Sequence, residues 1–147
     1  LVFQGEALFA KELLGLTEAA AKTVVYFTQG AGELGVIPPD GGQPADRPAT
    51  ELKAALERSG CVVKPLTFDP AAGDPKVPDD ADIVAVADPK APLAAGTVEA
   101  IRKFVADPRG DGKKKGKLVL VTGAHPAPTG GGLLQTGLEP VAERLGV

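Results

Sequence analysis

The amino-acid sequence predicts an α/β domain built around a mostly parallel β-sheet. Two observations lead to this prediction. Four short runs consist largely of apolar and β-branched residues, as buried strands do, and helical patterns separate these runs along the chain. Strands that are apolar along their whole length are typical of a parallel sheet that helices cover on both faces. The four predicted strands are residues 23–27, 61–66, 82–87 and 117–122.

The run Thr-Val-Val-Tyr-Phe at residues 23–27 is expected to be the central strand of this sheet. Before it, residues 1–3 are a candidate edge strand. Residues 5–21 predict a helix, because their apolar side chains follow the three-to-four spacing of a buried face. After the strand, residues 35–48 contain four Pro and three Gly, so we expect a long loop there.

The second half of the chain repeats the alternation of strands and helices. Thr50 suits an N-cap and Gly60 suits a C-cap, so these residues predict the two ends of a helix. The strand that follows contains Pro65, which suits an edge strand because proline has no N–H to donate to a neighbour. Residues 69–81 and 107–116 are rich in turn-forming and polar residues and predict connections. Helices are expected at residues 97–106 and 133–145.

The topology of the sheet follows from the handedness of β-α-β units. Because such units cross over in the right-handed sense, we expect the strand order two-one-three-four, counting residues 23–27 as strand one. This is a three-layer, Rossmann-like or flavodoxin-like arrangement. In such sheets ligands bind at the carboxyl ends of the strands where the order reverses, here between strands one and three. The residues predicted to line this crevice are Gly30, Gly32, Glu33, Asp88, Pro89 and Lys90.

Composition limits the classes of function that are open to the chain. A length of 147 residues fits a single domain, residues 1–147, with its own core. A net charge of −3 argues against a nucleic-acid-binding protein, which needs a basic face. The chain has no Met, not even at position 1, so we expect it to be a piece excised from a longer protein. One cysteine excludes an internal disulfide, and no run of 18 apolar residues is present to span a membrane.

One motif suggests a nucleotide site and then fails a physical test. The residues Gly-Ala-Gly-Glu-Leu-Gly at 30–35 match the G-x-G-x-x-G pattern and follow a strand. The pattern works only when its glycines open a helix whose N-terminus faces a pyrophosphate. Here the next residues are Val-Ile-Pro-Pro-Asp-Gly-Gly, which predict a loop. The interpretation we prefer is that the glycines permit a tight turn with positive φ.

Classical catalytic and metal-binding groups are few and far apart. Cys61 opens a strand, whereas His125 follows one, so they are expected at opposite edges of the sheet, about 17 Å apart. We therefore interpret Cys61 as a small buried apolar residue and His125 as an exposed loop residue. Asp79 and Asp80 are expected to make turn hydrogen bonds, not to bind a metal. We predict no catalytic residues, no cofactor and no metal.

The order of these signals resembles the GldG-like family, the auxiliary domain of ABC-type transport systems linked to gliding motility, which is also similar to a domain of intraflagellar transport proteins. The opening Phe-Gln-Gly-Glu-Ala-Leu, the strand and turn ending in Gly-Ala-Gly-Glu, and the segment from Val-Pro-Asp-Asp to Pro-Lys-Ala-Pro-Leu all look like the family's stretches. The closing strand and helix do so too. These stretches are residues 3–8, 25–33, 77–93, 116–121, 137–139 and 145–147.

The resemblance implies a non-catalytic α/β domain outside the cytoplasm, on the periplasmic side. It also implies a membrane tether outside these residues and partners among the membrane and ATPase subunits of a transporter. Ala31 stands where the family usually has His, and the loop at 35–48 looks longer than usual. Two other functions stay open from the residues themselves. One is a nucleotide- or small-molecule-binding enzyme that uses the crevice at residues 30–35. The other is an assembly module that docks a partner through the strand at 61–66 or through the long loop.

Overall fold

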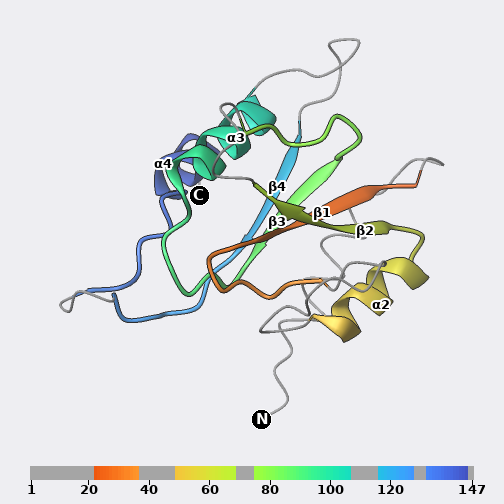
Figure 1. Cartoon of the computed structure of the whole chain (residues 1–147), viewed down its shortest axis with the longest axis horizontal. Helices are drawn as coiled ribbons and strands as arrows, with labels where there is room; N and C mark the ends of the chain where they lie inside the picture. Colours follow the sequence, from red (N-terminus) through yellow and green to blue (C-terminus); the bar gives the residue numbers. More distant parts are fainter. Residues whose placement is uncertain (1–21, 37–48, 69–74, 107–115, 128–131, 146–147) are drawn as a thin grey trace.

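The computed structural model describes residues 22–36, 49–68, 75–106, 116–127 and 132–145 of the chain. Strands and helices alternate along these residues, except that the strands at 62–67 and 83–87 follow one another with no helix in the described part of their connection (Figure 1). The elements are β1 (Val24–Gln29), α2 (Thr50–Arg58), β2 (Val62–Thr67), β3 (Ile83–Ala87), α3 (Ala95–Ala106), β4 (Lys117–Val121) and α4 (Glu139–Leu145).

The four strands form one sheet in the order β2-β1-β3-β4, and every pair is parallel. The predicted α/β class and strand order are therefore confirmed. β1 and β3 are the inner strands, and all five residues of β3 are buried, which explains why its sequence is apolar throughout. Pro65 lies in β2, an edge strand of this sheet, as its missing N–H predicts.

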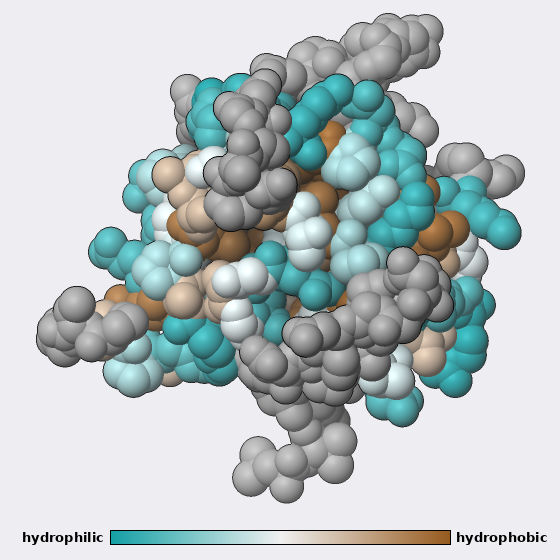
Figure 2. All heavy atoms as spheres, viewed as in Figure 1, coloured by the Kyte–Doolittle hydropathy of each residue, from teal (hydrophilic) through white to brown (hydrophobic). Residues whose placement is uncertain are grey.

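Helices cover both faces of the sheet and create two apolar cores (Figure 1). Successive side chains of a strand point to opposite faces, so Val25 and Phe27 of β1 pack toward α2, whereas Tyr26 packs toward α3 and α4. α2 contributes Leu52 and Leu56 to the first core. On the face drawn in Figure 2, the apolar residues of the described chain reach the surface in small patches among polar ones.

The starts of three helices differ from the prediction, and α3 begins at Ala95, two residues before its expected start. α4 begins at Glu139 and not at residue 133, because Gly137 has a φ of 87° and interrupts any helix before it. The Glu139 carboxylate accepts the backbone N–H groups of Thr136 and Gly137, at 2.6 and 2.8 Å. Burial acts to raise the pKa of Glu139, but these hydrogen bonds outweigh it and lower the pKa. α2 starts at Thr50 itself, and the N-cap position belongs to Ala49, which makes no side-chain cap.

The C-cap of α2 is Ser59, and Gly60, the predicted C-cap, is the next residue and has the positive φ of 88° that ends the helix. The predicted strand at 1–3 and helix at 5–21 lie outside the described residues, as do most of the loop at 35–48 and parts of the connections at 69–81 and 107–116. Among the helices that are described, none has the length and apolar character needed to cross a membrane.

Candidate functional site

The six predicted crevice residues lie together at the carboxyl edge of the sheet, in the loops that follow β1 and β3. These two loops are joined by their backbones. The N–H groups of Lys90 and Ala91 donate to the carbonyl oxygen of Ala31, at 2.8 and 3.0 Å. The N–H of Leu34 donates to the carbonyl oxygen of Ala87 at 2.8 Å. The loops are thus braced against each other at the point where the strand order reverses, the usual ligand position in this architecture.

The glycine turn has the conformation of a tight turn. Gly30 and Gly32 have φ values of 128° and 71°, which favour glycine. A Cβ atom on Gly32 would lie 3.1 Å from the Cβ of Lys90, so the lysine side chain begins directly over this turn. No helix starts within residues 30–36, all of which the structure describes. The helix that a pyrophosphate site needs at Gly32 is therefore missing from these residues.

Glu33 is the most unusual residue of the edge. Its side chain is buried, with 5% of the residue exposed. One carboxylate oxygen, Oε2, accepts the N–H of Ala31 at 2.6 Å. The other, Oε1, has no hydrogen-bond partner, and it is the one buried side-chain nitrogen or oxygen of the described residues in that condition. A buried acceptor without a donor costs about 1–3 kcal/mol, so such an atom calls for an explanation.

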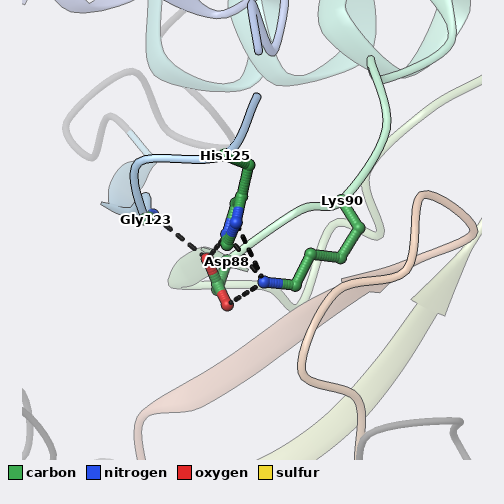
Figure 3. A network of polar contacts seen from close by, with 4 residues as sticks. All are labelled: Asp88, Lys90, Gly123 and His125. Carbon is green, nitrogen blue, oxygen red and sulfur yellow. Dashed lines mark hydrogen bonds and ion pairs between the residues drawn. The ribbon is translucent and has the colours of Figure 1, made fainter. Parts of the chain in front are cut away.

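Asp88 is the centre of a second polar group, which we call the clasp and define as Asp88, Lys90, Gly123 and His125 (Figure 3). Oδ1 of Asp88 accepts the N–H of Gly123 at 3.0 Å and lies 2.5 Å from Nε2 of His125. Oδ2 lies 3.0 Å from Nζ of Lys90. The clasp joins the loop after β3 to the loop after β4, the next strand of the sheet.

Backbone bonds hold the clasp residues in place. Asp88 has a φ of 52°, the one positive φ among the described non-glycine residues, and its N–H donates to Val121 at 2.7 Å. A Cβ on Gly123 would lie 2.7 Å from both Asp88 Oδ1 and His125 Nε2, so a larger residue there would displace these side chains. The N–H of His125 donates to Gly123, and its carbonyl accepts the N–H of Leu134 at 2.8 Å.

His125 lies in a loop, as predicted, but it is only partly exposed. Its side chain is 25% exposed and contacts both Asp88 and Lys90. The signal that could have found it is topological: Asp88 and His125 follow neighbouring parallel strands, and the carboxyl ends of such strands meet at one edge. Pro89, between the two charged clasp residues of the β3 loop, is fully buried and anchors that loop.

Cys61 is buried, as predicted, and burial raises the pKa of its thiol, so it is held in the unreactive protonated form. It precedes β2, at the amino edge of the sheet, whereas His125 follows β4 at the carboxyl edge. The two residues lie at opposite ends of the parallel strands and beside different outer strands, β2 and β4, so they form no catalytic pair.

Asp79 and Asp80 lie in a turn before β3, and both carboxylates also pair with lysine side chains. Asp80 accepts the hydroxyl of Tyr26 at 3.0 Å and pairs with Lys64 at 2.6 Å, and so ties β1 to β2. Asp82 accepts the N–H of Val24 at 2.9 Å, and Asp79 pairs with Lys76 at 2.7 Å. Within the described parts of the chain, no three His, Cys, Asp or Glu side chains are grouped as metal ligands would be.

The carboxyl edge therefore carries two polar features, Glu33 with its unpartnered oxygen and the clasp. Comparison with known proteins finds no match for the chain among protein-family models, curated proteins or solved structures.

Proposed function

We propose that the chain is a non-catalytic binding domain whose recognition group is the buried carboxylate of Glu33. The observation that carries this proposal is the unpartnered Oε1 atom at the point where the strand order reverses. A ligand that presents a hydroxyl, amine or amide donor to Oε1 would satisfy it. The ligand would thereby remove the cost, about 1–3 kcal/mol, of a buried acceptor that has no donor. The ligand is a small molecule or a chain segment of a partner protein.

The polar groups at the same edge of the sheet as Glu33 support a binding function without catalysis. The groups of the clasp that have acid, base or cationic character, Asp88, His125 and Lys90, are engaged with one another. A nucleophile paired with a base is the usual sign of covalent catalysis. The single cysteine is buried at the other edge of the sheet, which leaves it out of such a pair with the one histidine.

The setting of this binding domain comes from the family resemblance. We propose an auxiliary domain of an ABC-type transport system, GldG-like and related to gliding motility. It would act outside the cytoplasm, beside the membrane and ATPase subunits, with its membrane tether in other parts of a longer protein. Ala31 in place of the usual His fits a binding role, because it removes an acid–base group from the turn that holds Glu33.

The alternative of a nucleotide-binding enzyme gains nothing from the geometry, because residues 30–36 contain no helix to receive phosphates. The alternative of an assembly module rests on β2, an outer strand that carries Pro65, or on the long loop at 35–48, most of which lies outside the described residues. Proline on an edge strand discourages pairing with another chain, so the β2 surface is the weaker candidate.

A thermal-shift screen tests the proposal. The chain is heated with sugars, amines, amides, nucleotides, flavins and divalent metals, because a ligand present at 100 times its Kd stabilises the fold by about 2.7 kcal/mol. We expect a donor-bearing compound to raise the Tm of the wild-type chain and of Glu99→Gln, but not of Glu33→Gln. Glu99 is a matched control, since its carboxylate pairs with Arg102 on the surface of α3. A shift that survives in Glu33→Gln would sink the proposal, and a flat screen would favour the assembly module.

A further inference from the structure

We propose that Lys90 and His125 form an oxyanion-binding site that opens when the histidine is protonated. The ligand is a carboxylate or a phosphate group, and Asp88 positions the two cationic groups that bind it. This inference rests on the clasp alone and stands whether or not Glu33 receives a ligand.

The hydrogen-bond pattern determines the role of each ring nitrogen. Nε2 of His125 lies 2.5 Å from a carboxylate oxygen of Asp88, so it carries the proton and donates. In the neutral ring, Nδ1 is then the acceptor. Nζ of Lys90 lies 3.2 Å from Nδ1, within reach of donating to it. Nζ is also 2.7 Å from Nε2, but that nitrogen has no lone pair left to accept. The neutral clasp has one negative and one positive charge, and the short distance between Nζ and the protonated Nε2 is already a contact between two donors.

Protonation of the ring reverses the contact between His125 and Lys90. Nδ1 becomes a donor, and it then faces a second donor, the Lys90 ammonium, in a group whose charge has risen from zero to plus one. Two cationic donors at hydrogen-bond distance repel each other. An oxygen anion placed between Nδ1 and Nζ accepts from both and removes the repulsion. The Asp88 carboxylate remains on Nε2 and keeps the ring in position.

The surroundings allow such a ligand to enter. The side chains of Lys90 and His125 are 39% and 25% exposed, so solvent reaches both. Among the described residues, the charged groups in contact with the ring are Asp88 and Lys90, both from the loop after β3, and the backbone N–H of Gly123 binds Asp88 (Figure 3). The stem of Lys90 covers Gly32, so its ammonium can move while its Cβ stays on the turn.

Nuclear magnetic resonance of the imidazole tests the site directly. The chain has one histidine, so a sample labelled at histidine gives one set of ring signals. The ring is titrated between about pH 5 and pH 8 in sodium phosphate, sodium acetate, or sodium chloride of equal ionic strength. We expect phosphate or acetate to bind at least about tenfold more tightly at the acid end, and to move the titration midpoint to higher pH, as linkage requires. The salt that shifts the ring signals relative to sodium chloride shows whether the site binds phosphate or a carboxylate.

Variants separate this site from unspecific attraction of anions. Lys90→Met keeps an unbranched stem over Gly32 and removes the ammonium, so the anion effect should disappear. Lys90→Arg should retain it, and Lys103→Met on α3 is the control for loss of one positive charge. Cooperative thermal unfolding of each variant establishes that it is folded. Binding that is equal at both ends of the pH range, binding that survives Lys90→Met, or a ring that responds to neither oxyanion would overturn the proposal.

Discussion

Substitution of Asp88 should separate the energy of the clasp from the strain of its backbone. The carboxylate accepts hydrogen bonds from Gly123 and His125, each worth about 1 kcal/mol. Its pair with the partly exposed Lys90 adds about 0.5 kcal/mol. Asp88→Ala loses all three and keeps a Cβ at the φ of 52° that Asp88 already has, so it should lower the free energy of unfolding by about 2.5 kcal/mol. Asp88→Gly loses the same contacts but also removes the Cβ, which relieves about 1 kcal/mol of strain at this φ, so its net loss should be about 1.5 kcal/mol.

Urea unfolding followed by far-ultraviolet circular dichroism measures these differences, because the chain has no Trp for fluorescence. The expected order of stability is wild type, then Asp88→Gly, then Asp88→Ala, with the same m-value for all three. If Asp88→Ala proved as stable as Asp88→Gly, the positive φ would carry no cost. If both variants remained within about 0.5 kcal/mol of the wild type, the clasp would contribute nothing to the fold and the reasoning would fail.

Two further predictions concern the framework that positions the site. Leu138 is fully buried in the core cluster between α4 and the sheet, so Leu138→Ala should lower the free energy of unfolding in urea by about 2–5 kcal/mol. Leu133 is 67% exposed, so Leu133→Ala should lower it by less than about 0.5 kcal/mol. Equal losses would contradict the placement of α4. The hydrogen bond from the Lys64 ammonium lowers the pKa of Asp80 in the folded chain below its value of 3.8 in the unfolded chain. The pairing of Lys64 with Asp80 therefore stabilises the fold fully above about pH 3.8. This stabilisation is lost as the pH falls through the lower pKa of the folded chain. The stability difference between wild type and Lys64→Met should therefore narrow in acid, and a difference that widened there would contradict this.

The fold was predictable because its signals are local. The apolar runs of β1 and β3 identify inner strands of a parallel sheet, and Pro65 identifies an edge strand. The start of α4 was predicted too early because the apolar spacing of residues 133–138 looks helical. In the structure Gly137 has a positive φ, and the Glu139 carboxylate accepts the backbone N–H of Thr136, three residues before it. A capping interaction of this kind competes with helical spacing and outweighs it here.

The site was only partly predictable, because it depends on contacts between distant residues. The crevice residues Asp88 and Lys90 follow from strand order alone. His125 joins them from 35 residues further along, and only the pairing of β3 with β4 brings it there. The burial of Glu33 could not be read from a Gly-Ala-Gly-Glu turn, which occurs equally well on a surface. An unpartnered Oε1 is a property of the packed structure.

Mapping of a ligand by amide chemical shifts tests the central claim most directly. The nitrogen-15-labelled chain is titrated with the compound that gives the largest thermal shift in the screen. The account predicts that the largest changes fall on the backbone amides of residues 31–34, which surround Glu33, and on Lys90, whose N–H binds Ala31. Changes centred on β2, with residues 31–34 unmoved, would contradict a binding site at Glu33 and point to the edge strand as the working surface.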